Sequence, residues 1–418
     1  MHVFETVSVI GLGYIGLPTA ATLASSGVQV IGVDVSKRAV DAINQARAHF
    51  SEPDLDGLVQ SAVHSGKLRA VTAPEPAEAF IIAVPTPVME DKSADMSCVE
   101  RAARQLAPVL AEGNLIILES TSPVGTTAWM ASIIAGLRPD LFPGGDIATS
   151  KLHFAYCPER ILPGQMVYEL VHNDRILGGI TPVAAQMAKA LYERFVRGQL
   201  IVTKAEIAEL CKLIENAYRD VNIAFANEVS NICEEAGLDV FEAIAMANHH
   251  PRVNILNPGP GVGGHCIAVD PWFLISRYNE ITPLMRAARN VNDHRPHRYA
   301  DKIKIALASD KTRTVACLGL AYKPDVDDLR ESPAIEVVEL LADADAMLLV
   351  VEPNVEQLPA NLAGQANVKL VSLKEALEQA GTVALLVGHR QFKDVTGGQL
   401  AGKKIVDAIG YYRHHQTV

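Results

Sequence analysis

The chain has 418 residues, of which 20% are charged and 49% hydrophobic, and its net charge is −11. This length allows two or three domains with cores of their own, and the composition is that of a globular protein. The acidic balance argues against a nucleic-acid-binding surface, although it leaves room for a local basic pocket. No apolar run approaches the length of a membrane span, and no basic stretch precedes the first strand pattern. We therefore expect neither membrane insertion nor a signal peptide.

The cysteines stand singly along the chain, without C-x-x-C spacing. They are Cys98, Cys157, Cys211, Cys233, Cys266 and Cys317. This pattern predicts neither a metal site nor a disulfide framework. We expect a cytoplasmic protein in which most of these thiols are buried and inert.

Residues 1–200 alternate short β-rich runs with helical patterns. The strand candidates are "TVSVIGLG", "VQVIGVD", "AFIIAVP", "NLIILES" and "HFAYCP", with helices expected at "LPTAATLASSG" and "VERAARQLAPVLAEG". The strand runs are almost continuously apolar, as in a parallel sheet that is covered on both faces. This order predicts an α/β fold with a doubly wound, Rossmann-like domain.

The pattern changes near residue 203, where residues 203–236 contain no glycine or proline. Apolar residues recur there at helical spacing, which predicts one long helix of the kind that often forms dimer interfaces. After about residue 310, "RTVACLGLAYKP", "AMLLVVEP", "VKLVSL" and "TVALLVG" predict a second α/β sheet, with a helix at "SPAIEVVELLADA". The predicted domains are 1–200, 201–305 (helical) and 306–418.

The stretch "VSVIGLGYIGLPTA" places Gly11, Gly13 and Gly16 between a strand and a helix. These glycines permit a tight turn, approach of a pyrophosphate and close helix–strand packing, in that order. Asp34 ends the next strand, where a carboxylate suits the ribose hydroxyls of NAD and repels the phosphate of NADP. Arg38 lies nearby and weakens that preference. The alternative is a turn that binds no nucleotide.

Two further loops, "AVPTP" (83–87) and "ESTSPVGTT" (119–127), follow later strands. The carboxyl ends of parallel strands form the usual ligand-binding edge of a doubly wound sheet. Ser120, Thr121 and Thr126 could therefore bind cofactor or substrate. Ordinary turn and helix-start hydrogen bonds are the alternative for each of them.

Lys212 and Asn216 lie one turn apart on one face of the predicted long helix, and this face continues to Arg219 and Asp220. Lone lysines and asparagines on a helix are usually solvated surface residues. The helix should nevertheless border the cleft between the sheet domains, which makes the pair candidate catalytic residues.

The stretch "NPGPGVGGHCIAVDPW" (257–272) combines a glycine-rich loop with Cys266 and, four residues later, Asp270. Glycine backbone can approach a ligand closely, and nearby N–H groups and an ammonium favour the reactive thiolate. Asp270 could act as a base or orient another group. A small buried residue in a glycine turn is the alternative for Cys266.

NAD and a reactive thiol together indicate a four-electron oxidation. An alcohol first loses a hydride and becomes an aldehyde, which cannot lose a second hydride directly. Addition of the thiolate gives a tetrahedral thiohemiacetal that can, and hydrolysis of the resulting thioester gives a carboxylate. Lys212 and Asn216 are suited to hold the oxyanions that form on this path.

The third region opens with "LGLAYKPDVDDLRESP" (318–333), which places Lys323 and Arg330 beside a helix start at Ser332 and Pro333. Two cations at a helix N-terminus make a site for an anion such as a diphosphate. The alternative is that the cations pair with acidic neighbours, namely Asp325, Asp327, Asp328 and Glu331.

At this point the chain resembles a known family. "GLGYIGLP", "ESTSPVGT", "CPER", "ELCKLIENAYRDVNIAFANE", "PGVGGHCIAVDP" and "GLAYKPDVDDLRESP" follow one another as in the UDP-glucose/GDP-mannose dehydrogenase family, from about residue 6 to 413. The resemblance implies Cys266 as nucleophile and Lys212 with Asn216 at the oxyanion. Asp270 would serve in base or water activation beside Thr121.

The resemblance also implies ligand contacts. At NAD it implies Gly11, Gly13, Tyr14, Ile15, Gly16, Asp34, Arg38, Thr86, Thr121 and Arg330. At the substrate it implies Arg160, Lys212, Asn216, Arg252, Asn254, Gly259, Gly261, Gly263, Gly264, Tyr322 and Lys323. Arg252, in "HPRVN", would reach the neighbouring subunit's site, which implies a homodimer built on the long helix.

The "GGHCIAVDPWF" and "HHPRVNIL" stretches are most similar to the N-acetyl-hexosamine branch of the family, and within it to enzymes acting on UDP-N-acetyl-D-mannosamine. This implies a role in bacterial surface polysaccharides such as enterobacterial common antigen. UDP-glucose dehydrogenases usually carry two glutamates four residues apart. Here Glu159, a further catalytic candidate, is followed by Pro163, which argues against UDP-glucose.

Three alternatives stay open. The first is the same chemistry on UDP-N-acetyl-D-glucosamine, because the two sugars differ at one stereocentre. The second is a two-electron dehydrogenase of the hydroxy-acid type, which leaves Cys266 and the third domain without a function. The third is a catalytically silent nucleotide-sugar sensor.

Overall fold

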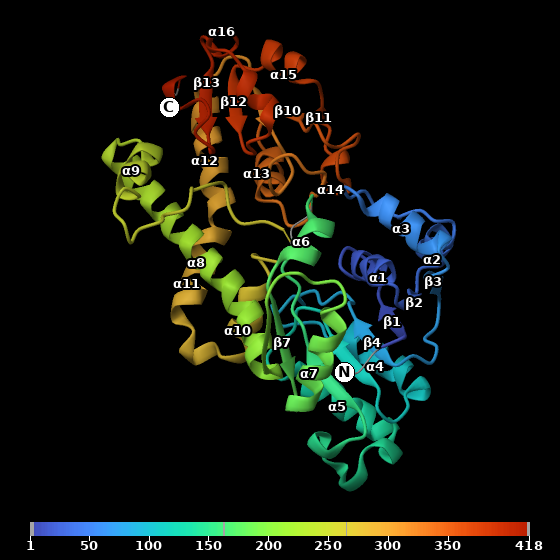
Figure 1. Ribbon diagram of the computed structural model, residues 1–418. Helices are drawn as coiled ribbons and strands as arrows, with labels where there is room; N and C mark the ends of the chain where they lie inside the picture. Colours follow the sequence, from blue (N-terminus) through green and yellow to red (C-terminus); the bar gives the residue numbers. More distant parts are fainter. Residues whose placement is uncertain (1–3, 162–163, 265, 416–418) are drawn as a thin grey trace. The chain divides into compact units, whose positions relative to one another are not determined.

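The computed structural model describes residues 4–161, 164–264 and 266–415. These residues fall into two units, 1–215 and 216–418, and each is described by itself. Figure 1 shows that each unit contains a sheet flanked by helices. The predicted α/β class, with two doubly wound parallel sheets and a helical segment between them along the chain, is confirmed.

The first unit is built on an eight-stranded sheet with the order β3-β2-β1-β4-β5-β6-β7-β8. Its strands are β1 (Thr6–Ile10), β2 (Gln29–Val33), β3 (Leu68–Val71), β4 (Ala79–Ile82), β5 (Leu115–Leu118), β6 (His153–Tyr156), β7 (Arg175–Gly179) and β8 (Leu200–Lys204). The five predicted strands are β1, β2, β4, β5 and β6. The sheet departs from the predicted parallel order at one place, because β7 runs antiparallel to β6.

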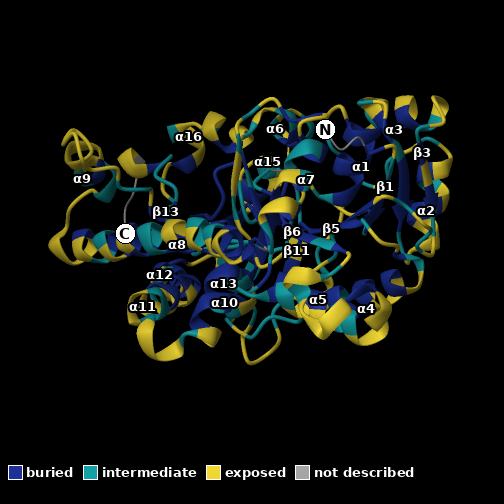
Figure 2. Ribbon diagram, turned by 60° about the horizontal axis from the view of Figure 1, so that its bottom comes forward, coloured by how far each residue is buried: buried dark blue, intermediate teal, exposed yellow. Residues whose placement is uncertain are grey.

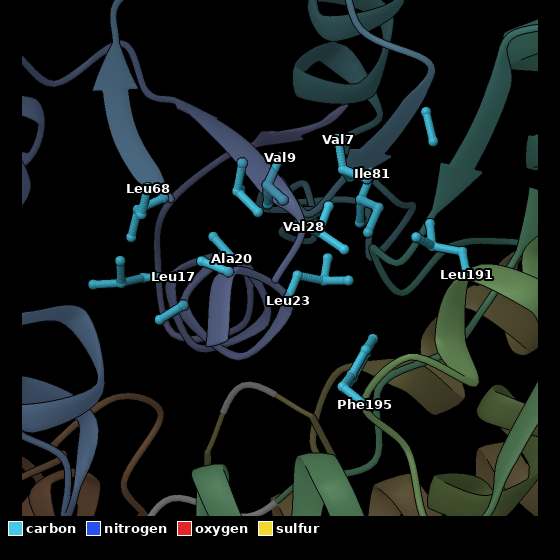
Figure 3. Close-up of a cluster of buried hydrophobic side chains, with 14 of the residues drawn as sticks. Val7, Val9, Leu17, Ala20, Leu23, Val28, Leu68, Ile81, Leu191 and Phe195 are labelled. Atoms are coloured by element: carbon cyan, nitrogen blue, oxygen red, sulfur yellow. The ribbon is translucent and has the colours of Figure 1, made fainter. Parts of the chain in front are cut away.

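Helices cover both faces of this sheet and form two hydrophobic cores. They are α1 (Gly16–Ser25), α2 (Lys37–Asn44), α3 (Leu55–His64), α4 (Ser97–Leu106), α5 (Thr126–Leu137), α6 (Met166–His172) and α7 (Pro182–Tyr192). Side chains alternate between the cores along each strand: Val7 and Val9 pack toward α1, whereas Ile10 belongs to the core under α4 and α5. Figure 3 shows Leu17 and Ala20 of α1 in the first core with these valines.

One helix prediction was too long. The sequence pattern over 99–113 gives α4, which ends at Leu106 and is followed by a single 3-10 turn at Ala107–Val109. Pro108 lies in that turn. Because proline has no N–H to continue the α-helical pattern, the helix stops there.

The long helix predicted over 203–237 is confirmed as α8 (Ala205–Ala236), one continuous helix of 32 residues (Figure 1). Its predicted start was slightly early, because Thr203 and Lys204 belong to β8. The second unit continues with α9 (Val240–Ala247), α10 (Asp270–Arg277), α11 (Pro283–Asp293) and α12 (Arg295–Ala308). None of the helices in the described ranges is long and apolar enough to cross a lipid bilayer.

The second sheet is parallel and has the order β11-β10-β9-β12-β13. Its strands are β9 (Thr314–Leu318), β10 (Met347–Val351), β11 (Val368–Leu370), β12 (Thr382–Leu385) and β13 (Lys404–Asp407), and its helices are α13 (Pro333–Ala342), α14 (Ala360–Ala363), α15 (Leu373–Gln379) and α16 (Gly397–Leu400). The buried strands and the exposed outer surfaces of the helices are visible in Figure 2.

The two sheets begin with the same turn. In the first, Gly11 N–H donates to the carbonyl of Val33 (2.8 Å) and Leu12 N–H donates to the Asp34 carboxylate (2.9 Å). In the second, Gly319 N–H donates to Val351 (2.8 Å) and Leu320 N–H donates to the Glu352 carboxylate (2.7 Å). A carboxylate at the end of the second strand thus fixes the turn after the first strand in both sheets.

The second turn is filled by protein groups. The Glu352 carboxylate also accepts from Ala321 N–H (2.9 Å) and from His389 Nε2 (2.9 Å). His389 Nδ1 accepts the N–H of Asp325 (2.9 Å), so its proton lies on Nε2 and is donated to Glu352. Ala321 stands where the first turn has Gly13. The carboxylate of the second turn is therefore bound by more protein groups than the Asp34 carboxylate of the first turn.

A cluster of charged groups is buried in the first unit. Glu119 follows β5 and accepts from the hydroxyl groups of Tyr192 and Thr19. Glu159 pairs with Arg175 at 2.5 Å, with both side chains buried. Burial, reinforced by the charge of Glu159, raises the pKa of Glu119 to about 7.

This burial predicts a pH-dependent stability. The Glu119 carboxyl has an ordinary pKa of 4.5, whereas the folded chain holds its proton up to a pKa of about 7. Between these values the folded state binds more protons than the unfolded state, so stability falls as pH rises, by about 1.4 kcal/mol per unit of pKa difference. The free energy of unfolding, measured with urea across this pH range, should change less with pH in Glu119→Gln than in the wild type. The exposed Glu112→Gln serves as the control, and the same pH dependence in Glu119→Gln as in the wild type contradicts the prediction.

Candidate functional site

The first glycine turn has the geometry of a pyrophosphate site. Gly11 has φ +88°, and a Cβ there would lie 2.5 Å from the carbonyl oxygen of Ala83. A Cβ on Gly16 would lie 1.8 Å from the carbonyl oxygen of Gly11, so α1 can approach β1 only without it. Gly13 has no atom within 4 Å of a built Cβ. The helix start behind this open space has no side-chain cap and no acidic residue in its first turn, so it suits an anion.

Asp34 stands at the edge of the same turn. Its two carboxylate oxygens accept from Leu12 N–H (2.9 Å) and Ser36 N–H (2.8 Å), which fixes its orientation. Arg38 lies exposed in the first turn of α2, and Tyr14 packs against Phe50 with 4.5 Å between ring centroids. A carboxylate that is fixed in this way, with one face partly exposed, fits the ribose hydroxyls of NAD.

The next strand ends bring Thr86 and Thr121 together, because the Thr86 hydroxyl donates to the carbonyl of Thr121 (2.6 Å). The Ser120 hydroxyl donates to Val84 O (2.7 Å), and Thr126 donates to the carbonyl of Pro123 (2.6 Å). For Ser120 and Thr126 the structure therefore favours turn chemistry over ligand binding. Thr121 is partly exposed and stays a candidate.

Glu159 and Arg160 are held by protein groups. The Glu159 carboxylate accepts from Arg175 (2.5 Å) and from the N–H of Arg160 (2.7 Å). Arg160 donates to Glu215 (3.1 Å) and to the carbonyl of Asp174 (2.6 Å). These contacts favour a structural role for Glu159, and its catalytic role stays a prediction. Pro163 lies outside the described residues.

Helix α8 carries Lys212 and Asn216 four residues apart. Lys212 is only 8% exposed, so it is not a solvated surface lysine. The Asn216 side-chain amide donates to the carboxylate of Asp270 at 2.5 Å. Further along the same helix, Arg219 is exposed, whereas Asp220 is buried in an ion pair with Arg289 (2.6 Å). Lys212 and Asp220 of the predicted polar face are therefore buried, whereas Arg219 faces solvent.

Cys266 begins the turn that leads into α10. The N–H of Asp270 donates to the Cys266 carbonyl (2.8 Å), and the Asp270 side chain is 2% exposed. Cys266 itself is partly exposed, which sets it apart from Cys157 and Cys317. Complete burial raises the pKa of each of those two thiols to about 12, so they stay protonated and inert. All six cysteines are free thiols.

Three of the glycines before Cys266 lie close to other protein groups, whereas contact of this loop with a substrate stays a prediction. A Cβ on Gly261 would lie 2.8 Å from Pro333, and one on Gly264 would lie 2.8 Å from the ring of Tyr322. A Cβ on Gly263 would meet the carbonyl oxygen of Glu331 at 2.5 Å. These glycines let the loop pack on the segment after β9. A Cβ on Gly259, in contrast, would have no atom within 4 Å.

This packing brings the thiol close to Tyr322. The pKa of Tyr322 is raised to about 12, mainly by burial and further by the charges of Asp328 and of the Cys266 thiolate. Lys323 lies 5.8 Å from the centre of the Tyr322 ring. The phenol therefore stays protonated beside the thiol at neutral pH.

The predicted anion site at the start of α13 is only partly of the expected form. Arg330 makes a bidentate pair with Asp328 (2.9 and 2.7 Å), which is the alternative that the sequence left open. Ser332 precedes the first helical residue, and its buried hydroxyl has no hydrogen-bond partner among the described residues. Lys323 and this helix start remain suitable for a phosphate.

Arg252 and Asn254 lie exposed on a loop after α9. The Asn248 side chain closes this loop, because its amide donates to Ile255 O (3.0 Å) and its oxygen accepts from Ile255 N–H (2.7 Å). The loop is thus ordered around its base and presents the Arg252 side chain to solvent.

Sequence reasoning missed the groups that anchor the glycine loop. Gly259 N–H donates to Asn227 Oδ1 (3.0 Å), and the carbonyl of Gly259 accepts from Arg295 Nε (3.0 Å). The available signal was the asparagine in "AFANE", which comes eleven residues and therefore about three helical turns after Asn216.

Three family models match successive parts of the chain. They describe the UDP-glucose/GDP-mannose dehydrogenase family: its NAD binding domain (residues 5–196), its central domain (206–294) and its UDP binding domain (316–414). The chain belongs to the UDP-glucose/GDP-mannose dehydrogenase family. It is therefore an NAD-dependent dehydrogenase of nucleotide sugars, and the predictions of NAD as cofactor and of an enzyme are confirmed.

Relatives within this family are similar over nearly their whole lengths. An NDP-N-acetyl-D-galactosaminuronic acid dehydrogenase from Ralstonia nicotianae is 54% identical over 411 residues, covering 98% of this chain and 96% of the relative. A UDP-N-acetyl-D-mannosamine dehydrogenase from Yersinia pestis is also 54% identical, covering 98% and 100%. The solved UDP-D-ManNAc dehydrogenase from Pyrococcus horikoshii superposes with a TM-score of 0.87 at 38% identity, covering 97% and 96% of the two chains.

Two glycines of the cofactor turn offer a matched test. Gly16→Ala forces a methyl group against the Gly11 carbonyl oxygen and should destabilise the fold by about 1–3 kcal/mol or more. Gly13→Ala meets open space, so its free energy of unfolding should change by no more than about 0.5 kcal/mol. Its methyl group should instead obstruct the pyrophosphate and weaken NAD binding. Urea unfolding and calorimetric titration with NAD measure both effects, and normal NAD affinity in Gly13→Ala would show that the pyrophosphate binds elsewhere.

Proposed function

We propose that the protein oxidises the C6 alcohol of UDP-N-acetyl-D-mannosamine to the carboxylate of UDP-N-acetyl-D-mannosaminuronate, with two NAD⁺ reduced per sugar. One observation carries this proposal: the side chain of Asn216 is bonded to Asp270 (2.5 Å), whose N–H is bonded to the Cys266 carbonyl (2.8 Å). The amide assigned to the oxyanion and the turn that bears the thiol therefore form one hydrogen-bonded unit.

The electrons balance through the thiol of Cys266. The alcohol gives a proton to a base and a hydride from C6 to NAD⁺, which leaves an aldehyde. The Cys266 thiolate bonds to the aldehyde carbon, and the oxygen takes a proton. Loss of that proton to a base and of a second hydride to a second NAD⁺ leaves a thioester, and water breaks its C–S bond to give the carboxylate, a proton and the free thiol.

Lys212 and Asn216 supply donors to the oxygen of C6. An oxyanion forms when the thiolate adds and again when water attacks the thioester. A buried ammonium and an amide that are oriented in advance each contribute roughly a hundredfold to such steps. Asp270 holds the Asn216 amide, and we assign base and water activation to Asp270 with Thr121.

The nucleotide end of the substrate is assigned to the segment after β9. The side chain of Lys323 and the start of α13 supply positive charge for the diphosphate. Tyr322 offers a phenol that stays protonated, because its pKa is raised to about 12. Arg160 and the backbone of the glycine loop at Gly259 are further candidates for contacts with the substrate.

The sugar is an N-acetyl-hexosamine in both relatives named above, and the two are equally identical to this chain. We propose the manno sugar first because the "HHPRVNIL" and "GGHCIAVDPWF" stretches match that branch. The galacto and gluco N-acetyl sugars are the competing substrates. The ratio of kcat/KM over a panel of these UDP-sugars decides between them.

We infer a homodimer built on α8. One face of this helix carries apolar side chains that are exposed in the single chain: Ile207, Leu210, Ile214, Tyr218, Phe225 and Ile232. They recur every three, four or seven residues and form a stripe of the kind that buries itself against a partner. Arg252, on its projecting loop, is the residue assigned to the neighbouring subunit's substrate.

The product is a sugar acid linked to UDP, which suits the assembly of an acidic bacterial surface polysaccharide. We infer a cytoplasmic location, which the six free thiols support. The proposed domains are 1–200 for NAD, 201–305 for the catalytic helix and dimer contacts, and 306–418 for the UDP-sugar. The ranges matched by the family models support this division.

Substitution of the nucleophile tests the mechanism. Wild-type enzyme should form two NADH per UDP-uronate, as measured by absorbance and by mass spectrometry of the sugar. Cys266→Ala should bind NAD normally and form no acid, because no covalent adduct can form. Cys211→Ala, on a different partly buried thiol, serves as the control. One NADH per turnover with release of the aldehyde would refute the covalent path.

A charge on the α8 stripe tests the dimer. Phe225 is 52% exposed in the single chain, and Phe225→Glu should convert a dimer into a monomer in light scattering because a buried carboxylate is costly. Val183→Glu makes the same change at a residue of α7 that is 57% exposed and should leave the dimer intact. A dimer that persists in Phe225→Glu places the interface elsewhere.

A further inference from the structure

A carboxylate from α8 caps the start of α5. Glu209 Oε2 accepts the N–H of Gly125 (2.5 Å), and Oε1 accepts both the N–H and the hydroxyl of Thr127 (2.8 and 2.6 Å). Helix α5 has no side-chain cap from its own N-cap residue and no acidic residue in its first turn. Glu209, which is distant in sequence, therefore supplies what a local cap would normally supply.

The Glu209 side chain is completely buried, and burial raises its pKa. The three hydrogen bonds and the positive end of the α5 dipole are what offset the cost of that burial. The N-cap residue of α5 is Gly125, whose φ of +92° disfavours a serine or aspartate there. The start of α5 therefore depends on the distant Glu209 for its side-chain cap.

The contact joins two segments with assigned roles. Residues 119–125 form the loop that bears Thr121, and the hydroxyl of Thr86 holds the other part of that loop. On α8, Lys212 comes three residues after Glu209 and therefore lies on the same side of the helix. One carboxylate thus ties the helix of the proposed oxyanion lysine to the loop at the cofactor edge of the sheet.

We propose that Glu209 is a positioning residue, which fixes the axial and rotational setting of α8 so that Lys212 stands in register with the Thr121 loop. This rests on the role proposed for Lys212 above. Groups that stabilise an oxyanion must be held within about 0.5 Å of their working position. A misplacement of about 1 Å can cost on the order of 100-fold in rate.

The decisive comparison is between two glutamates on the same helix. Glu209→Gln keeps the shape of the side chain but turns an NH₂ group toward the N–H donors at the start of α5. Glu206→Gln makes the same change one turn earlier, at an exposed position. Glu209→Gln should lower kcat at least tenfold and change KM for NAD and for the UDP-sugar by less than threefold, whereas Glu206→Gln should match the wild type.

A double variant separates positioning from plain structural support. If Glu209 acts through Lys212, adding Glu209→Gln to Lys212→Ala should lower kcat no further. If the two substitutions lower kcat independently, so that their effects multiply in the double variant, the proposal is overturned. A Glu209→Gln enzyme that melts at a lower temperature but keeps the wild-type kcat would also overturn it, because that result indicates capping alone.

A milder pair of variants covers the case in which Glu209→Gln does not fold. Thr127→Val removes one of the three donors at constant volume, and Thr127→Ser restores the hydroxyl. We expect kcat to be highest in the wild type, lower in Thr127→Ser and lowest in Thr127→Val. Equal kcat in all three contradicts the proposal. Every assay uses a UDP-sugar that the wild type oxidises. A wild type that oxidises none refutes the proposed function, whereas an active wild type with unaffected variants refutes only the role of Glu209.

Discussion

Backbone N–H groups at the ends of strands and helices need partners, and the positions of the candidate functional groups depend on how that need is met. Asp34 binds the turn that faces the pyrophosphate, through Leu12 N–H at 2.9 Å. Glu209 binds the start of α5, and Asn227 binds the glycine loop through Gly259 N–H at 3.0 Å. In each case the partner comes from a distant segment. The functional loops are therefore held by side chains that lie outside the glycine and cysteine motifs themselves.

The same hydrogen-bonding arrangement occurs in both sheets, but its surroundings differ. Both use a carboxylate at the end of the second strand to bind the turn after the first, and both share the strand order around that turn. In the first sheet the turn keeps an open position at Gly13. In the second, Ala321 and the Glu352–His389 pair fill the equivalent place. The second sheet thus repeats the hydrogen-bonded turn of the first, with the Glu352–His389 pair beside it.

The strands that the sequence patterns missed explain what such patterns can reveal. β3, β8 and β13 lie at the edges of their sheets, where one side of the strand is less covered and apolar runs are shorter. β7 was missed because Arg175 and two glycines interrupt its pattern. Buried central strands, the long helix and the glycine turn were predicted correctly because each has a strong local signal. Glu209 has no such signal, because a glutamate in an amphipathic helix is ordinarily exposed. It becomes a buried cap through its tertiary contact with the start of α5.

The glycine loop gives a physical reason for the position of the thiol. Thiols inside the cores, such as Cys157 and Cys317, have a pKa near 12 and cannot supply a thiolate at neutral pH. A fully mobile loop would supply one without fixing its position. Gly263 and Gly264 resolve this conflict, because their backbone packs directly on protein and fixes the loop while Cys266 stays partly exposed. The contacts of these glycines with protein allow a positioned thiol to remain outside a core, and their contact with a ligand stays a prediction.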